Sequence, residues 1–347
     1  MNNNTNRAVY PLTVAITYNL KDPLSVTEDD AEFDDISTIE AIRKALETVV
    51  SRVMLVDLSL GPIEQLIYNR PDIVFNIAEG TNGRGREAQI PAILSFLDIP
   101  YTGSDETTMC LTLDKTITKL LAKSSGIRTP KWVTLETADD EIPTDLHYPV
   151  IVKPNAEGSS KGISSDSVVY DRIQLEAMLM SRFKQKETLL VEEFIEGREF
   201  TVGILGNGKD IKVFEPMEIV FKDKNHSVYG YDIKQNFQEY IEYTVTSKIP
   251  HAVIRELSDM AGKAFKLFGC KDMARVDFRV NEFNEVYFIE INPLPGLAPG
   301  YSDFPMIAEF SGIGYTSLIV QILKTAMMRY SLNSYIALSC EAEGGNK

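Results

Sequence analysis

The chain has 347 residues, of which 50 are acidic and 35 are basic, so its formal net charge is −15. Nucleic acids and anionic membranes attract basic surfaces, so this balance excludes a general binder of either. Three cysteines and three histidines, all well separated, exclude a disulfide framework, a CxxC metal site and a HExxH zinc helix. The sequence has no apolar run of about 18 residues and its first residues are polar, so we expect a cytoplasmic protein without a membrane span or signal peptide.

Apolar runs in the first third of the sequence predict strands that alternate with helical segments. The predicted strands are Thr13–Ile16, Val53–Leu58 and Ile73–Ala78. Strands that alternate with helices are typical of a parallel, doubly wound sheet. We therefore expect an α/β fold here and assign residues 1–110 to a first domain.

Two helices are predicted among these strands. Ser37 and Glu40 have the spacing of a capping box, and the apolar residues that follow, as far as Val50, recur at helical spacing. The second helix is predicted over Gln89–Leu97, with Pro91 in its first turn.

A small mixed unit is predicted for residues 111–195. It begins with a helix over Leu113–Ser125, which Gly126 closes as a C-terminal glycine. Its other predicted elements are a helix over Arg172–Lys184 and strands over Lys131–Leu135, Pro149–Lys153 and Thr188–Ile195.

Antiparallel patterns dominate residues 196–347, so we expect an α+β third domain. Glu199–Leu205 and Ile211–Phe214 flank the Gly206–Gly208 turn and predict a hairpin. The polar, aromatic segment Tyr229–Tyr243 has no clear period, which indicates a long functional loop or lid. The other predicted elements are helices over His251–Phe268 and Tyr315–Tyr330 and strands over Ala274–Val280 and Val286–Ile291.

The last two predicted strands carry four polar residues that alternation brings together. If residues 282–285 form a four-residue loop, antiparallel pairing places Asp277 opposite Glu290 and Arg275 opposite Asn292. Two carboxylates and an amide oxygen suit Mg²⁺ when substrate phosphates complete its octahedron. Arg275 beside them could hold an oxyanion or a phosphoryl group. The alternative is an exposed hairpin with a polar face and an incidental ion pair.

Two further segments have the composition of phosphate or nucleotide contacts. A buried strand delivers Lys153 to a Gly/Ser-rich loop that ends at Gly162, where backbone N–H groups could approach phosphate oxygens. This loop is not a Walker A sequence, and a plain surface turn is the alternative. The acidic strand end Leu190–Ile195, followed by Glu199, could accept from ribose hydroxyls or could be a solvated edge.

In this order, these segments resemble the ATP-grasp superfamily, and most closely the D-alanine–D-alanine ligase family. The resemblance runs from about Asp72 to Leu323. Its blocks are Pro100–Ser104 with Leu113–Lys115, Val150–Gly162, Glu199–Val202, Arg275–Phe278, and Phe288–Pro293 with Pro295–Gly296. The resemblance implies a three-domain ATP-grasp architecture, a homodimer, and ATP held between the central and C-terminal domains.

The resemblance also implies roles for individual residues. The implied nucleotide-binding residues are Lys115, Lys153, Glu157, Gly158, Ser159, Ser160, Glu192, Glu193, Phe194, Ile195, Glu199 and Lys234. Asp277, Glu290 and Asn292 resemble ligands of two Mg²⁺ ions, with Mn²⁺ as a substitute. The implied catalytic residues are Arg275, Ser159 and Lys234, and the implied substrate contacts are Gly296, Ser302 and Glu79.

The implied reaction has two steps. A substrate carboxylate attacks the γ-phosphate to give an acylphosphate, and an amine then displaces phosphate through a tetrahedral intermediate whose oxyanion Arg275 would stabilise. A closed lid would exclude the water that hydrolyses acylphosphates.

The acceptor half of the sequence departs from the family pattern. The family's GGxSxE-type first loop is absent, and Thr17–Pro23 follows the first strand instead. Gln235 stands beside Lys234 where the family usually has a tyrosine, and Glu79-Gly80 replaces a common His-Gly pair. We therefore expect small-molecule acid and amino-acid substrates other than two D-alanines. The alternatives are a true D-alanine–D-alanine ligase, an amino-acid ligase of small-molecule biosynthesis (for example on a mycosporine-type core), and a non-catalytic ATP-binding homologue.

One short segment holds much of the negative charge. Residues 28–35 contain six acids and no base: Glu28, Asp29, Asp30, Glu32, Asp34 and Asp35. This segment is either a solvated face or a feature that favours a cationic amine at the substrate entrance.

Overall fold

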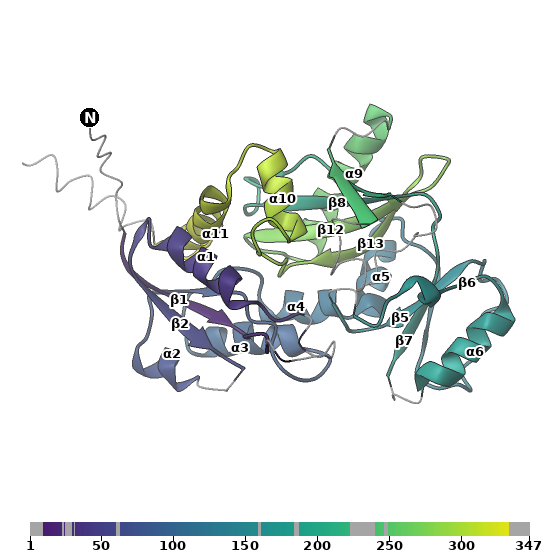
Figure 1. Ribbon diagram of the computed structural model, residues 1–347, viewed down its shortest axis with the longest axis horizontal. Helices are drawn as coiled ribbons and strands as arrows, with labels where there is room; N and C mark the ends of the chain where they lie inside the picture. The colour runs from purple at the N-terminus through teal and green to yellow at the C-terminus, as the bar shows by residue number, and fades with distance from the viewer. Residues whose placement is uncertain are drawn as a thin grey trace, which may run out of the picture.

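The strands of the computed structural model form three separate sheets. The structure describes residues 10–22, 24, 30, 32–59, 63–158, 161–183, 187–222, 240–245 and 249–332. The first sheet and the four-stranded sheet lie at opposite ends of the view, and the six-stranded sheet lies above and between them (Figure 1). A mixed α/β fold was predicted, and the structure confirms it.

The first sheet is parallel, as predicted, with the strand order β2-β1-β3. Its strands are β1 (Tyr10–Tyr18), β2 (Val50–Asp57) and β3 (Ile73–Asn76). The helices of this region are α1 (Ile36–Leu46), α2 (Glu64–Tyr68), the 3₁₀ helix Arg86–Ala88, α3 (Gln89–Phe96) and α4 (Glu106–Leu113). Pro91 lies in the first turn of α3, where its missing N–H has no helical partner to lose.

The predicted capping box and the predicted end of the first helix are wrong. The N-cap of α1 is Asp35 rather than Ser37, and no side chain caps this end. The helix ends at Leu46, and Val50 is already in β2, paired with Tyr10. A β-branched residue packs well on a pleated surface, so strand pairing overrides the helical spacing of its side chain.

The second sheet is antiparallel, with the order β4-β7-β5-β6. Its strands are β4 (Trp132–Leu135), β5 (Val150–Pro154), β6 (Val168–Val169) and β7 (Leu189–Glu193). Helix α5 (Lys115–Ser124) precedes this sheet and α6 (Arg172–Arg182) packs on it. The predicted helix start at Leu113 is wrong, because Leu113 ends α4 and Asp114 is the N-cap of α5. Gly126 follows α5 in a left-handed conformation (φ 71°), as a C-terminal glycine does.

The third sheet has six antiparallel strands on the path β11-β10-β8-β12-β13, with β9 paired to β8. Its strands are β8 (Arg198–Leu205), β9 (Lys212–Val213), β10 (Met217–Phe221), β11 (Ile241–Thr244), β12 (Met273–Val280) and β13 (Val286–Asn292). The remaining helices are α9 (His251–Leu267), α10 (Asp303–Phe310) and α11 (Tyr315–Arg329). The predicted hairpin around Gly206–Gly208 is confirmed by the β8–β9 pair.

The loop predicted over Tyr229–Tyr243 is partly wrong. Its last residues belong to β11, where Tyr243 pairs with Ile219 of β10. Residues 229–239 of this segment lie outside the described part of the chain. In the described residues, no single helix is long and apolar enough to span a membrane. Helices α10 and α11 reach that length and apolar composition only together, across a bend of 105°.

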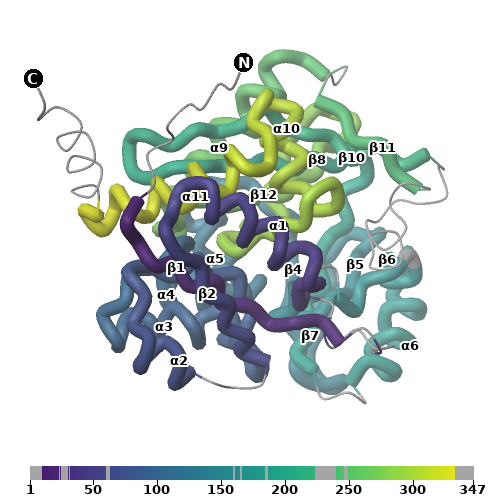
Figure 2. The backbone as a smooth tube through the Cα atoms, turned by 60° about the vertical axis from the view of Figure 1, so that its left-hand side comes forward, coloured from purple at the N-terminus to yellow at the C-terminus, as the bar shows by residue number. Residues whose placement is uncertain are grey.

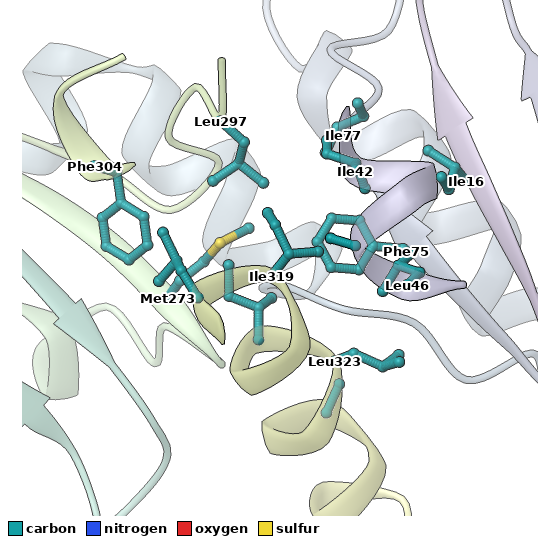
Figure 3. Packing of buried hydrophobic residues seen from close by; sticks show 14 of the residues in the cluster. Ile16, Ile42, Leu46, Phe75, Ile77, Met273, Leu297, Phe304, Ile319 and Leu323 are labelled. Atoms are coloured by element: carbon teal, nitrogen blue, oxygen red, sulfur yellow. The ribbon is translucent and has the colours of Figure 1, made fainter. Parts of the chain in front are cut away.

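Helix α11 lies between the first sheet and the six-stranded sheet. Figure 3 shows Ile319 and Leu323 of α11 between Phe75 on one side and Met273 and Phe304 on the other. Helices α1 and α11 also lie side by side in Figure 2. Fully burying an Ile or Leu side chain contributes about 1.5–3 kcal/mol. The first and the last of the three sheets therefore share one hydrophobic core.

Candidate active site

Strands β12 and β13 bring four predicted site residues to one region of the six-stranded sheet. Arg275 pairs with Asn292 and Asp277 pairs with Glu290, as expected from the sequence. The Arg275 guanidinium donates to both Asp277 oxygens, at 3.0 Å from Nε and 2.8 Å from Nη2. Asn292 Nδ2 donates to Asp277 Oδ2 at 3.1 Å.

A β-bulge sets the direction of the Glu290 side chain. The loop spans residues 281–285, one residue more than the four-residue loop from which the pairing was predicted. Near the loop, Phe278 therefore pairs with Phe288. The register then shifts between Phe278 and Asp277, which leaves Ile289 as the extra residue. Unbroken alternation from Phe288 would turn Glu290 into the core. The bulge instead leaves Glu290 partly exposed, as Asn292 is.

The oxygens of Asp277, Glu290 and Asn292 are donors that Mg²⁺ prefers. Asp277 already accepts from Arg275, from Asn292 and from Thr201 Oγ1 at 2.7 Å. A carboxylate offers about four acceptor positions, so a cation at Asp277 would displace one of these donors. No described group of three or more His, Cys, Asp or Glu side chains could hold a metal by itself. The donor set therefore fits a magnesium ion whose coordination is completed by phosphate oxygens.

Lys115 contacts the glycine-rich loop and the acidic edge of β13. It starts α5, and the Asp114 side chain caps this helix by accepting a backbone N–H at 3.0 Å. Lys115 Nζ lies 3.5 Å from Glu290 Oε2 and donates to the carbonyl oxygen of Glu157. Burial would raise the pKa of Glu290, but the charges of Lys115 and Lys153 outweigh it and lower this pKa to about 2. The Glu290 carboxylate is therefore ionised at neutral pH.

Glu192 joins two buried lysines. Its carboxylate lies 2.5 Å from Lys119 Nζ and forms a second ion pair with Lys153. Burial lowers the pKa of Lys119 to about 8. Burial also acts to lower the pKa of Lys153, but the charge of Glu192 outweighs it and raises that pKa. Lys119 was not predicted from the sequence, although its i,i+4 spacing from Lys115 places both on one helix face.

A narrow, largely apolar pocket lies between the four-stranded and six-stranded sheets. Six of the predicted nucleotide residues line it: Lys153, Glu192, Glu193, Phe194, Ile195 and Glu199. Its apolar wall is formed by Ile151, Ile163, Phe200, Ile219, Phe278 and Ile289. We call this space the nucleotide-side pocket.

Arg279 shapes the end of this pocket and was not predicted. Its guanidinium lies 4.5 Å from the Phe194 ring centroid and 3.1 Å from Glu199 Oε2. Burial raises the pKa of Glu199 to about 7, although the charge of Arg279 opposes the shift. The alternation of Asp277 and Arg279 on β12 was the signal in the sequence that could have revealed this residue.

The glycine-rich loop is tied to the first third of the chain. The Gly158 N–H donates to Glu32 Oε1 at 2.7 Å, and a Cβ on Gly158 would lie 2.5 Å from that oxygen. Arg86 donates to Glu32 and, through Nη1, to the Ala156 carbonyl at 2.8 Å. A side chain at position 158 would therefore displace the Glu32 carboxylate from its present position. The predicted residues Ser159, Ser160 and Lys234 lie outside the described part of the chain.

A cavity of about 520 Å³ lies on the other side of Arg275, which we call the acceptor-side cavity. This volume is typical of a small-molecule site. The predicted substrate residues Glu79, Gly296 and Ser302 all line it. A Cβ on Gly296 would lie 2.8 Å from Ser302 Oγ, and Ser302 Oγ accepts the Ala298 N–H at 3.1 Å. The position of Glu79 is set from the residue that follows β1, because Asn19 Oδ1 accepts the backbone N–H of Glu79 at 2.9 Å.

Two described residues, Arg275 and Asp303, line both the nucleotide-side pocket and the acceptor-side cavity. Arg275 Nη1 lies 3.5 Å from Asp303 Oδ2, and the Tyr243 hydroxyl donates to Asp303 Oδ1 at 2.9 Å. Burial acts to lower the pKa of Arg275, but Asp277 and then Asp303 outweigh it and raise that pKa. A permanently charged guanidinium therefore lies where the two spaces meet.

The chain is similar to known proteins in sequence and in fold. The family model described as D-ala D-ala ligase C-terminus matches residues 121–324. The D-alanine–D-alanine ligase of Aquifex aeolicus is 34% identical over 289 residues, which are 83% of this chain and 94% of that protein. The uncharacterized protein y4sG of Sinorhizobium fredii is 34% identical over 265 residues, which are 76% of this chain and 77% of that protein. The crystal structure of the Bacillus anthracis D-alanine–D-alanine ligase complexed with ATP has a TM-score of 0.70 at 22% identity and covers 93% of this chain and 99% of that one.

The three sheets have the fold of that ATP-bound ligase structure, and together with the family match they place the chain among the ATP-grasp ligases. The chain belongs to the D-alanine–D-alanine ligase family, and it is an ADP-forming carbon–nitrogen ligase.

Proposed function

We propose that this protein is an ATP- and Mg²⁺-dependent ligase that joins a carboxylate, through an acylphosphate, to the amine of an amino acid. ADP and phosphate would be released. The observation that carries this proposal is the position of Arg275, which lines both the nucleotide-side pocket and the acceptor-side cavity. A transfer between two bound substrates needs such a charged group where they meet.

The nucleotide half of the reaction rests on buried charge. Lys153 is 3% exposed and Lys115 is 6% exposed, so both can hold phosphate oxygens where water screens poorly. Asp277, Glu290 and Asn292 would hold two Mg²⁺ ions, with Mn²⁺ as a substitute. When bound, these ions would neutralise the charge of the β- and γ-phosphates.

The chemistry at the acceptor side would depend on Arg275. A carboxylate in the acceptor-side cavity could attack the γ-phosphate, and the amine could then attack the acyl carbon. The guanidinium would stabilise the oxyanion that forms in this second step. Ser159 and Lys234 remain proposed catalytic residues, and Ser302 and Gly296 remain proposed substrate contacts.

We further propose that the substrates are not two D-alanines. The acceptor-side cavity is lined by Glu79, where the family often has histidine, and by the acidic residues Glu32, Asp34 and Asp35. D-alanine is a small zwitterion with a single ammonium group, which cannot pair with this many carboxylates. The cavity volume of about 520 Å³ also leaves room for larger substrates.

A second candidate is a D-alanine–D-alanine ligase with an altered first loop. It is supported by the 34% identical relative from Aquifex aeolicus, which is a D-alanine–D-alanine ligase. An amino-acid ligase of small-molecule biosynthesis is a special case of the first proposal. We also propose a cytoplasmic homodimer, and we keep the division into residues 1–110, 111–195 and 196–347, which the three sheets support.

The test is ADP release with ATP and Mg²⁺ across D- and L-amino acids and candidate acids, with product masses. We expect release with at least one pair other than two D-alanines. Release with D-alanine alone would establish the second candidate. Absence of release with every pair would favour a non-catalytic ATP-binding homologue.

A further inference from the structure

The acceptor-side cavity contains carboxylates that form no ion pair within the described residues, although the charges of Arg86 and Lys115 act on one of them, Glu87. Asp34, Glu79 and Glu87 all line it. None of these three side chains forms a hydrogen bond or ion pair within the described residues. Glu32, by contrast, also lines the cavity but is paired with Arg86.

Glu87 is the most informative of the three. It is only 8% exposed, yet its side chain faces the cavity from the 3₁₀ helix Arg86–Ala88. An ionised carboxylate that is this little exposed and has no hydrogen-bond partner is costly, which favours a ligand group that pairs with it. Burial, followed by the charge of Glu32, raises the pKa of Glu87 to about 7. The pKa of Glu79 is also raised, first by burial and then by the charges of Glu87, Glu32 and Asp34.

The cations on the cavity wall do not balance these acids. Arg275 already forms a hydrogen-bonded ion pair with Asp277. Lys21 is then the one other lining cation among the described residues, and three acids line the same cavity: Asp34, Glu79 and Glu87. A bound metal ion does not fit, because no described group of three or more carboxylates has an arrangement that could hold one. The cavity therefore suits an organic cation that is larger than a metal ion.

The geometry orients such a ligand. The cavity is lined by Arg275 and Asn292 of the reacting edge and also by Glu79, which follows β3, and by Glu87 of the 3₁₀ helix. A neutral amino acid brings one ammonium that its own carboxylate balances. Two unbalanced acids need a substrate with an additional positive group.

We propose that one substrate of this ligase carries a second cationic nitrogen, as a diamino acid or a guanidino amino acid does, and that Asp34, Glu79 and Glu87 bind the group that does not react. This inference rests on the proposed function and names the substrate class of its acceptor-side cavity. It also gives the acidic segment at residues 28–35 a role through Asp34.

The experiment compares amino acids with similar side chains that differ in the presence of the positive charge. Lysine is compared with norleucine, and arginine with citrulline, in both enantiomers and with a common panel of second substrates. A charge-assisted hydrogen bond contributes about 1.5–3 kcal/mol, which is a factor of ten or more. We expect kcat/KM for the charged member to exceed that of the neutral member at least tenfold. Equal kcat/KM for both members of each pair would overturn the proposal. Comparing the two pairs shows whether the site prefers an ammonium or a guanidinium group.

Variants and binding provide independent readouts. Glu87→Gln and Glu79→Gln should each reduce the preference to less than threefold, mainly through a loss of kcat/KM for the charged member. Glu309→Gln, on the exposed face of α10, is the matched control and should retain the preference. A preference that survives both cavity variants would contradict the proposal.

Thermal stability is measured with each amino acid in the presence of a non-hydrolysable ATP analogue and Mg²⁺. We expect the charged member to raise the Tm more than the neutral one, even where no ADP is released. Failure of turnover with every pair therefore tests the proposed function alone. Equal shifts of Tm for charged and neutral members would refute the substrate class.

Discussion

Glu32 and Arg86 form a nearly buried, bidentate ion pair, with Nη2 2.6 Å from Oε1 and Nε 2.9 Å from Oε2. Each side chain is only 9% exposed. Breaking a buried pair by removing one charge costs about 3–5 kcal/mol. We expect Glu32→Gln to lower the free energy of unfolding by about 3 kcal/mol. It should also raise the KM for ATP, because Gly158 loses its charged acceptor.

A matched control exists on α1, where Glu40 pairs with Arg43 at 2.6 Å on the solvent side. Exposed pairs contribute little, so Glu40→Gln should leave urea denaturation and the KM for ATP nearly unchanged. Equal effects of the two substitutions would contradict the role assigned to Glu32.

Glu87 predicts how stability depends on pH. Its pKa rises from 4.5 to about 7 on folding, mainly through burial. Between these values the native state keeps the proton that the unfolded state has released, so stability falls as pH rises from about 4.5 to 7. Glu87→Gln removes this loss and should stabilise the protein at pH 8 by an amount of order 3 kcal/mol.

The measurement is the Tm of wild type and Glu87→Gln from pH 5 to pH 8. The difference should be large at pH 8 and small near pH 5. A difference that is constant across this range would show that the Glu87 carboxylate does not titrate as described. The neighbouring charges of Glu32, Arg86, Lys115 and Glu290 are present in both proteins.

Glu290→Gln should abolish phosphoryl transfer, because an amide cannot replace the charge that faces Lys115 at 3.5 Å. Glu285→Gln is the control on the same hairpin, where Glu285 only accepts from Asn281 and Tyr287 in the turn. The assay is ADP release with the best substrate pair. Turnover of Glu290→Gln near the wild-type rate would rule out its assigned place at the metal and phosphate site.

Asp303 positions Arg275 from the acceptor side. Asp303→Asn removes a buried charge 3.5 Å from the guanidinium and should lower kcat about tenfold, equivalent to about 1.4 kcal/mol, with little change in the KM for ATP. Tyr243→Phe removes only the hydroxyl that donates to Asp303 at 2.9 Å and should have a smaller effect. Hydroxylamine trapping distinguishes the two half-reactions. Acylphosphate should still form in Asp303→Asn, and loss of trapping would place Asp303 in the first step instead.

Local patterns predicted most of the fold because the strands and helices here follow their periodicity. The register of β12 and β13 was predicted correctly from a loop length that was one residue too short. The extra loop residue is compensated by the bulge at Ile289. Alternation alone cannot reveal a bulge, and here the extra residue, Ile289, lines the nucleotide-side pocket, which exists only in the folded protein.

The site was predictable where its residues lie on one hairpin, and much less so where it depends on distant segments. Arg275, Asp277, Glu290 and Asn292 are close because adjacent strands carry them. Lys119, Arg86 and Glu87 were missed because their roles come from burial against other parts of the chain. The sequence shows that these residues are charged, but it does not show that they are buried.

The shared core of α11 and the first sheet has a consequence for biosynthesis. Phe75 is made early, but Ile319 and Leu323 are among the last described residues of the chain. Domains usually fold in order as they leave the ribosome. Here the apolar face of the first sheet, which α1 covers in part, is not fully covered until α11 has been translated. Part of the core of the first sheet therefore forms only after most of the described chain has been made.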